Sequence, residues 1–421
     1  MNSVFRNRNF MLLLSGKVVS MLGDQVYAFA LAWYILSITK SSFQMSLFLF
    51  ADALAVALVS PFGGVVADRL SRKAILVWMD IVRCLVVLVA AFLLYRHELR
   101  IWMLYGSAIA LGSCGAVFNP AAGAIIPNVV SDDELAGATS MNQFSWSLCA
   151  FAGMLAGGFL FNLIGIFAIF ALNAASFLVS AVLESRVVIG PCLRPLVAAS
   201  ASIRLEIRRI LRELAEGYRY VRGKALIFKL IFISAIYNLI LLPVGFVCIP
   251  YFFNVTLKAS PYQLALSTGS VFVGMMLASL LVPHFLEKYK LRSALFWGLL
   301  VLCASQLVIV PVLSPPLRSY FDNWRLTYFI SFVSFAMGAA MTFFNIPITI
   351  IFQKSCADEY RGRFWGFYSS ITSLVIPFAY ILGGSLAQRI PIVLIFGAAG
   401  VLMLLLDLWI ISLRELRELR E

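Results

Sequence analysis

Two charged residues lie within a long apolar stretch near the start of the chain. The stretch "LSGKVVSMLGDQVYAFALAW", residues 14–33, contains Lys17 and Asp24. Their seven-residue spacing would place them on one face of an α-helix, about 10 Å apart. An ionisable group inside hydrocarbon costs about 3 kcal/mol or more, so it is a candidate for substrate binding or proton transfer. We expect this role of Asp24, with a buried structural pair as the alternative. Lys17 either lines the same site or extends to the nearer headgroups.

Further charges occur in other apolar stretches. Asp52 lies in the second stretch and is a second candidate for proton coupling or substrate binding. Asp80 and Arg83 are three residues apart, a spacing that permits an ion pair on a helix, and we expect that pair to be structural. Asp407 lies near the end of the last stretch and is expected to reach the headgroups.

Uncharged polar and aromatic residues within the apolar stretches are candidates for lining a cavity. They are Tyr27, Asn119, Asn142, Trp146, Tyr237, Asn238, Asn345 and Tyr368. Asn119 lies directly before Pro120 and Asn345 lies two residues before Pro347, so their side chains either line a central site or satisfy backbone groups that the proline frees. A cavity rich in aromatic side chains and poor in charge suits an amphipathic molecule.

The elements that carry these residues are predicted to be transmembrane helices. The chain has 421 residues, of which 62% are hydrophobic and 13% charged, and its mean hydropathy is +0.94. A soluble protein could not bury so much apolar surface. Apolar windows of sufficient length predict an all-α polytopic membrane protein with twelve spans. The spans are 10–38, 43–67, 74–95, 101–127, 136–164, 166–188, 225–253, 262–286, 293–313, 326–352, 362–388 and 392–413.

The distribution of lysine and arginine predicts the orientation of these spans. Most of the basic residues fall in segments on the side where the chain begins and ends. The positive-inside rule therefore predicts a multi-pass membrane protein with both termini in the cytoplasm. It also accounts for the net charge of +13 without a nucleic-acid partner.

The chain is predicted to consist of two related halves. Residues 1–188 form an N-terminal six-helix bundle, 189–224 a cytoplasmic linker, and 225–421 a C-terminal six-helix bundle. The linker contains "IRLEIRRILRELAEGYRYVRG", an amphipathic pattern that favours a helix lying at the headgroups. The strings "FNPAAGAIIPN" and "FNIPITIIFQK" begin 226 residues apart, at Phe118 and Phe344, which indicates an internal repeat. Two repeated bundles are typical of secondary transporters with a midplane site.

A charged motif follows the second predicted span. The string "GGVVADRLSRKAIL", residues 63–76, resembles the loop between helices two and three of the major facilitator superfamily. Its positions are filled by Gly64, Asp68, Arg69, Arg72 and Lys73. A degenerate copy, "LVPHFLEKYKLRSAL", follows the eighth span and lacks the glycine.

We expect the motif and its copy to form two cytoplasmic latches of a conformational gate. Asp68 would meet the positive N-terminus of the eleventh span, and the copy would meet the acidic start of the fifth. The other residues of these contacts are Arg361, Arg363, Lys288, Arg292, Asp132 and Glu134. The alternative is that these residues only fix the topology.

The resemblance extends over nearly the whole chain. "SMLGDQVYAFALAW", "FNPAAGAIIPNVVSDDELAGATSMNQ" and "RGRFWGFYSSITSLVIPFAYILGGSLAQRI" are similar to the efflux branch that includes macrolide and enterobactin exporters. This implies the major facilitator fold, with two pseudo-symmetric six-helix bundles, and proton-coupled export of a small drug-like or siderophore-like molecule by alternating access. The fifth-span antiporter motif survives only in part, as "CAFAGMLAGG", and the fourth span lacks the arginine of many antiporters. Uptake or lysophospholipid translocation by the same fold is the alternative.

Other classes of protein fit the sequence less well. No cluster of acidic residues and histidines suggests an enzyme, and no phosphate-binding loop suggests an ATP-driven pump. Two histidines and seven scattered cysteines make a metal site improbable, and no cofactor is expected. The expected partners are a small-molecule substrate, protons and membrane lipids, and the protein is expected to be a monomer.

Overall fold

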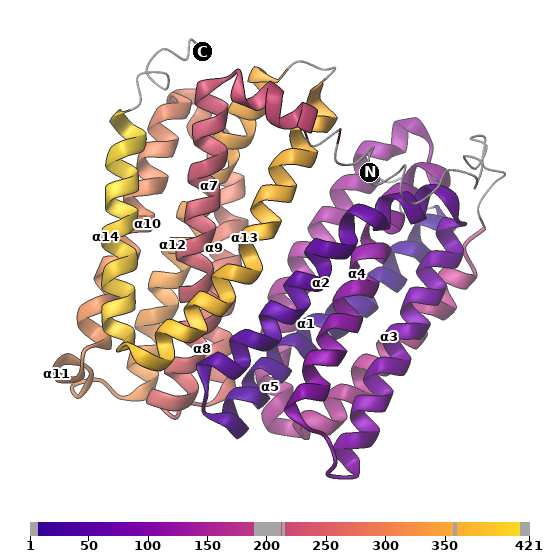
Figure 1. Ribbon diagram of the computed structural model, residues 1–421, viewed down its shortest axis with the longest axis horizontal. Helices are drawn as coiled ribbons and strands as arrows, with labels where there is room; N and C mark the ends of the chain where they lie inside the picture. Colours follow the sequence, from indigo (N-terminus) through magenta and orange to yellow (C-terminus); the bar gives the residue numbers. More distant parts are fainter. Residues whose placement is uncertain (1–6, 189–211, 213–214, 357–359, 413–421) are drawn as a thin grey trace. The chain divides into compact units, whose positions relative to one another are not determined.

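The computed structural model describes residues 7–188, 212, 215–356 and 360–412, without the side chains at 64, 65, 67–69, 132, 133, 136, 354, 355, 361–363 and 411. Every regular element in these ranges is a helix (Figure 1). Eleven of these helices are long and apolar enough to cross a membrane. The prediction of an all-α polytopic protein is confirmed.

Five long helices form the first half of the chain. They are α1 (Arg8–Thr39), α2 (Ser42–Arg69), α3 (Arg72–Tyr95), α4 (Ile101–Val129) and α5 (Asp132–Ser185). The helix α5 has 54 residues, and Gly165 interrupts it with a φ of 74°. Glycine tolerates this left-handed conformation because it has no Cβ. The two parts, 132–164 and 166–185, are each long enough to span a bilayer, so α5 supplies the predicted fifth and sixth spans.

Six long helical segments form the second half. The first runs through α7 (Ala225–Pro243), a π-helical turn (Val244–Cys248), α8 (Ile249–Tyr251) and a second π-helical turn (Phe252–Thr256). Proline at 243 and 250 removes backbone donors there, which explains the irregular winding. The others are α9 (Pro261–Lys288), α10 (Leu291–Leu313), α12 (Asn323–Ser355), α13 (Arg361–Arg389) and α14 (Ile392–Ser412). The short α11 (Pro315–Arg318) lies in the predicted loop after α10.

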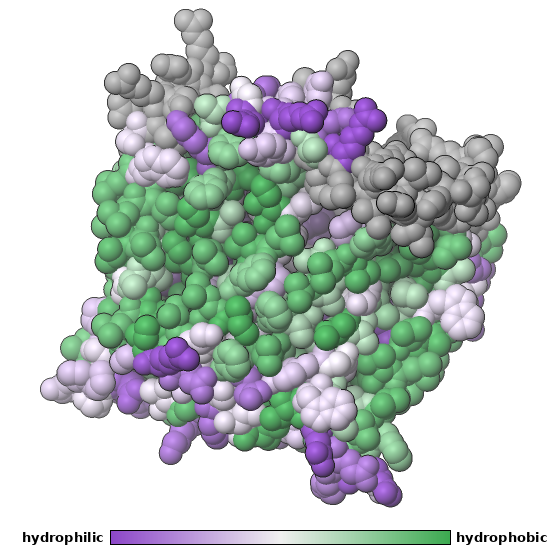
Figure 2. All heavy atoms as spheres, viewed as in Figure 1, coloured by the Kyte–Doolittle hydropathy of each residue, from purple (hydrophilic) through white to green (hydrophobic). Residues whose placement is uncertain are grey.

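Contacts divide the chain into two compact units. The first comprises Met1–Ile35 and Phe48–Ile210, and the second comprises Leu36–Leu47 and Leu211–Glu421. In each unit the sides of the helices are mostly apolar, and polar residues gather at the helix ends (Figure 2). Large side chains such as Leu280 and Phe332 are more than half exposed, as expected for surfaces that face lipid. The predicted boundaries of the linker, 189–224, fall largely outside the described residues and stay a prediction.

Glycine brings α5 close to α1 in the first unit. A Cβ atom at Gly157 would lie 3.1 Å from the carbonyl oxygen of Val26 and 3.1 Å from Cβ of Phe29. A Cβ atom at Gly153 would overlap the side chain of Gln25. Both glycines belong to the fifth-span string "CAFAGMLAGG". They allow α5 to pack directly beside the part of α1 that carries Asp24.

Candidate functional site

A cavity of about 390 Å³ lies inside the first unit. Its wall includes six of the residues predicted from the sequence: Lys17, Asp24, Tyr27, Asp52, Asn119 and Trp146. The side chains come from α1, α2, α3, α4 and α5, so no single helix builds the site. The cavity is therefore a property of the packed unit, and its polar groups were recognisable in the sequence as charges within apolar stretches.

The helix α1 contributes one face to the cavity. Lys17, Met21, Asp24 and Ala28 follow each other at intervals of three or four residues, the spacing of one helical face, and all four line the cavity. Asp24 lies 16 residues from the start of α1, which corresponds to about 24 Å along the helix axis. This depth places the carboxyl group well within the span.

Lys17 lies in the cavity wall and contacts α5. Its Nζ donates a hydrogen bond of 2.8 Å to Oδ1 of Asn142, another residue predicted to line a cavity. The residue is partly buried, and the bond directs its ammonium group across the unit toward α5. Of the two positions that the sequence left open for Lys17, the structure has the one in the cavity wall.

Asp52 occupies the side of the cavity formed by α2 and α4. A Cβ atom at Gly112 of α4 would lie 2.8 Å from Oδ1 of Asp52, so the glycine makes room for this carboxyl group. Asp52 is partly buried and lies within electrostatic range of Asp24 and Arg83. Two carboxyl groups and one guanidinium group thus line one cavity.

Asp80 and Arg83 form a buried ion pair on α3. Arg83 Nη1 lies 3.4 Å from Asp80 Oδ1, and the two side chains are 7% and 0% exposed. The guanidinium group also lies over the ring of Phe118, 4.6 Å from its centroid, a cation–π contact. Arg83 is in addition part of the cavity wall. The sequence reasoning gave this pair a structural role and did not foresee that its arginine reaches the cavity.

The predicted residues of the second unit have different surroundings. The Tyr237 hydroxyl donates a hydrogen bond to Oδ1 of Asp407, and the two residues are 2% and 4% exposed. The expectation that Asp407 reaches the headgroups is therefore wrong, because Tyr237 holds its carboxyl group in the core. Tyr368 packs among aromatic rings, 5.3 Å from Phe352 between centroids. Asn238 is partly buried, and Asn345 is exposed on α12.

The residues of the predicted gate are described only in part. Arg72 Nη1 donates hydrogen bonds of 2.7 Å to the carbonyl oxygen of Ala124 and 2.6 Å to Oδ1 of Asn128, so it ties the start of α3 to the end of α4. Glu134 accepts a 3.4 Å hydrogen bond from the backbone nitrogen of Ser131 and caps its own helix. Lys73 is partly buried and Lys288 exposed. The structure does not describe the side chains of the other gate residues, which are Asp68, Arg69, Asp132, Arg361 and Arg363, or the surroundings of Gly64. The latches therefore stay a prediction.

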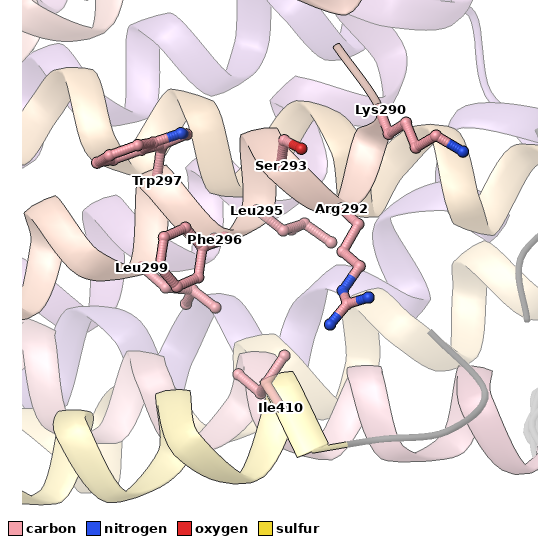
Figure 3. Close-up of a pocket in the computed structure, with 8 residues that line it drawn as sticks. All are labelled: Lys290, Arg292, Ser293, Leu295, Phe296, Trp297, Leu299 and Ile410. Atoms are coloured by element: carbon pink, nitrogen blue, oxygen red, sulfur yellow. The ribbon is translucent and has the colours of Figure 1, made fainter. Parts of the chain in front are cut away.

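Arg292 lines a second cavity, at the start of α10. This cavity has a volume of about 380 Å³ and is lined by Lys290, Arg292 and Ser293 together with Trp297 and Ile410, among others. Figure 3 shows the Arg292 side chain extending from α10 toward α14, beside Ile410. The described residues that line this cavity combine basic and aromatic side chains at a helix end and include no carboxyl group.

One buried acid of the first unit, Glu184, was not among the residues predicted from the sequence. It is 1% exposed and lies in the last turn of α5. It lies near the end of the predicted span 166–188, where a charged side chain usually reaches the headgroups. The signal that could have found it is a polar stripe: Asn173, Ser176, Ser180 and Glu184 recur every three or four residues and so share one helical face.

Membrane-capable helices and a cavity with acidic, basic and aromatic walls in the first unit are features that membrane transporters share. Comparison with known families makes the assignment specific. The chain belongs to the Major Facilitator Superfamily, whose family model matches residues 13–315 and 242–420. As a member of this superfamily it is a membrane transporter and not an enzyme, and the resemblance inferred from the motif is confirmed.

Similar proteins support this assignment over the whole length. Macrolide efflux protein A of Streptococcus pyogenes is 24% identical over 97% of both chains. An uncharacterized MFS-type transporter of Bacillus subtilis, YfiS, is 27% identical over 99% of this chain and 96% of its own. A bacterial homologue of the iron transporter ferroportin, crystallised in an inward-facing state, has a TM-score of 0.71 at 18% identity and covers 96% of this chain and 99% of its own. The last of these similarities shows the fold alone.

Proposed function

We propose that this protein is a secondary active transporter that exports a small amphipathic molecule in exchange for protons. It works by alternating access in a bacterial inner membrane, with both termini in the cytoplasm. The observation that carries the proposal is the cavity of the first unit, where Asp24 and Asp52 lie beside Tyr27, Phe48 and Trp146. Carboxyl groups can carry protons, and aromatic walls bind the apolar part of a substrate.

The direction and the class of substrate rest on similarity. Relatives over nearly the full length include macrolide efflux protein A, and macrolides are amphipathic molecules. The proposed orientation rests on the excess of lysine and arginine in the segments on the side of the termini. Within the cavity, Asp24 is the proposed proton carrier because it lies deep in the span and its carboxyl group is within electrostatic range of the Arg83 guanidinium group. Asp52 is its proposed partner in binding the substrate or a proton.

The test uses inverted membrane vesicles that contain the protein. A pH gradient, acid inside, is imposed, a radiolabelled macrolide is added, and both macrolide uptake and proton release are recorded. We expect uptake that collapses when the gradient is dissipated. A siderophore serves as a second probe. If a sodium gradient drove the uptake and a proton gradient did not, the proton-coupled mechanism would be wrong.

Asp24→Asn is the first variant for this assay. The amide keeps the size of the side chain but cannot release a proton, so we expect gradient-driven uptake to fall to the level of empty vesicles. The matched control is Asp322→Asn, an exposed acid that caps α12. The amount of each variant in the membrane is measured by immunoblot. Wild-type uptake by Asp24→Asn would remove this residue from the mechanism.

A further inference from the structure

The second part of α5 presents a polar stripe to α1. A Cβ atom at Gly23 would lie 2.7 Å from Oδ1 of Asn173. Two turns earlier on α1, a Cβ atom at Gly16 would lie 3.3 Å from Cγ of Glu184 and 3.4 Å from Oγ of Ser180. Glycine at both positions therefore lets the stripe pack directly against α1. The stripe runs beside the segment of α1 between Gly16 and Asp24.

Glu184 is buried with few polar neighbours. Both oxygens of its carboxyl group are inaccessible to solvent and make no hydrogen bond of good geometry among the described residues, and Ser180, one turn earlier on α5, is the uncharged polar side chain that acts on it. Phe10, Leu13 and Leu14, which precede Gly16 on α1, and Val187, three residues after Glu184, belong to one buried apolar cluster of the first unit. An ionised carboxylate is strongly disfavoured in such surroundings, because nothing replaces the water that it loses.

The charges inside the first unit do not balance when every group is ionised. The side chains that interact with Glu184 are Asp80 and Arg83 of α3, Ser180 of α5 and Lys17 of α1, of which only Ser180 is uncharged. Arg83 is paired with Asp80, and the hydrogen bond recorded for Lys17 goes to the neutral amide of Asn142. With Asp24 and Asp52, the described interior holds four carboxyl groups against two cations. A low-dielectric interior favours neutrality, which requires protons on some of these carboxyl groups.

We propose that Glu184 is a second proton-binding site of the transporter, separate from Asp24, and that Lys17 pairs with its ionised form. In the present conformation Glu184 holds a proton and Lys17 binds Asn142. When the apolar cluster around Phe10 opens, the proton passes from the carboxyl group to water, and the Lys17 ammonium group leaves Asn142 for the new carboxylate. One proton leaves, so the net charge of the interior falls by one, and the ion pair with Lys17 compensates the new negative charge.

The position of Lys17 links this second site to the cavity. Asn142 and Trp146 lie one turn apart on α5, and both Lys17 and Trp146 line the cavity. Movement of Lys17 toward Glu184 therefore changes the charge and the shape of the cavity wall. Release of the second proton would in this way alter substrate binding. This part of the inference rests on the proposed function, whereas the protonation of Glu184 does not.

Infrared spectroscopy of the purified full chain in detergent tests the protonation directly. A protonated carboxylic acid has a C=O stretching band that a carboxylate lacks. We expect the wild-type spectrum at neutral pH to lose one such band component in Glu184→Gln and to keep it in the control Glu98→Gln, which alters an exposed acid. Identical protonated-acid bands in wild type and Glu184→Gln would overturn the proposal.

A second variant guards against loss of folding. If Glu184→Gln does not elute as a monodisperse species, Glu184→Asp is measured in its place. This variant keeps the acid but moves it away from Gly16, so we expect the same band component at a shifted frequency. An unshifted band would show that the acid responsible is another residue, and the proposal would fail.

Transport stoichiometry provides a readout that a merely structural role would not change. In inverted vesicles, Glu184→Gln should lower the number of protons moved per macrolide by about half, because one of two exchangeable acids is lost. Glu184→Asp should restore the wild-type ratio. A wild-type ratio in Glu184→Gln would overturn the second site even if Asp24→Asn abolished coupling. If wild-type protein moved no protons at all, the proposed function would fail, and the infrared result would still decide the state of Glu184.

Discussion

At the scale of single residues, the bond between Tyr237 and Asp407 is the clearest polar contact inside the second unit. Removing the hydroxyl by Tyr237→Phe would leave a buried carboxyl oxygen without its donor. We expect a loss of about 1–3 kcal/mol in the free energy of unfolding. The measurement is thermal unfolding in detergent, with Tyr328→Phe as control because Tyr328 is 60% exposed. An equal melting temperature for both variants would show that this hydrogen bond contributes nothing to stability.

Some residues of the site could be predicted from the sequence, and others could not. Lys17, Asp24 and Asp52 are visible because a charge in the middle of an apolar stretch is unusual, and all three line the cavity. Glu184 is more deeply buried than these three residues but lies near the end of its stretch, where a charge usually reaches the headgroups. The ion pair with Asp80 on the same helix was a sufficient reason for a charge at Arg83, so nothing in the sequence indicated that Arg83 also lines the cavity. Sequence spacing identifies a partner on the same helix, whereas contacts with other helices depend on how those helices rotate.

At the scale of elements, the approach of α5 to α1 determines the position of Asp24. Gly157→Leu would place a side chain where the backbone of Val26 and the ring of Phe29 now lie. We expect this overpacking to cost about 1–3 kcal/mol and to displace the face of α1 that carries Asp24. Lower melting temperature in detergent and weaker macrolide uptake in vesicles are the two measurements.

The control for this substitution is Gly106→Leu. Gly106 is exposed on α4, and no atom lies within 4 Å of the position of its added Cβ. We expect this variant to have the melting temperature and the macrolide uptake of the wild type. Equal behaviour of the two leucine variants would mean that close packing of α1 on α5 is not required.

Helix positions could be predicted from the sequence, whereas helix pairing could not. Hydropathy defines each span because the hydrocarbon core sets its length, and Gly165 marks the break in α5 where the prediction placed it. Hydropathy does not show which face of a span contacts a neighbour, since lipid and protein interior are similarly apolar. The irregular winding between Pro243 and Thr256 also leaves no trace in an apolar pattern.

At the scale of the whole molecule, the superfamily assignment fixes the fold but leaves the orientation in the membrane as a proposal. The loop between α3 and α4 contains Glu98, and the loop between α9 and α10 contains Tyr289. With cytoplasmic termini, the first loop lies outside and the second inside. Single cysteines at these two positions therefore report the orientation without any transport assay.

The native cysteines hardly interfere with such labelling. Those at 84, 114, 149, 248, 303 and 356 are buried, so a polar reagent should not reach them, and Cys192→Ser removes the seventh. In intact cells we expect a membrane-impermeant maleimide to label Glu98→Cys strongly and Tyr289→Cys only after the cells are opened. The Cys192→Ser background without either substitution is the control. Labelling of Tyr289→Cys in intact cells, with protection of Glu98→Cys, would reverse the orientation and with it the proposed direction of proton flow through Asp24.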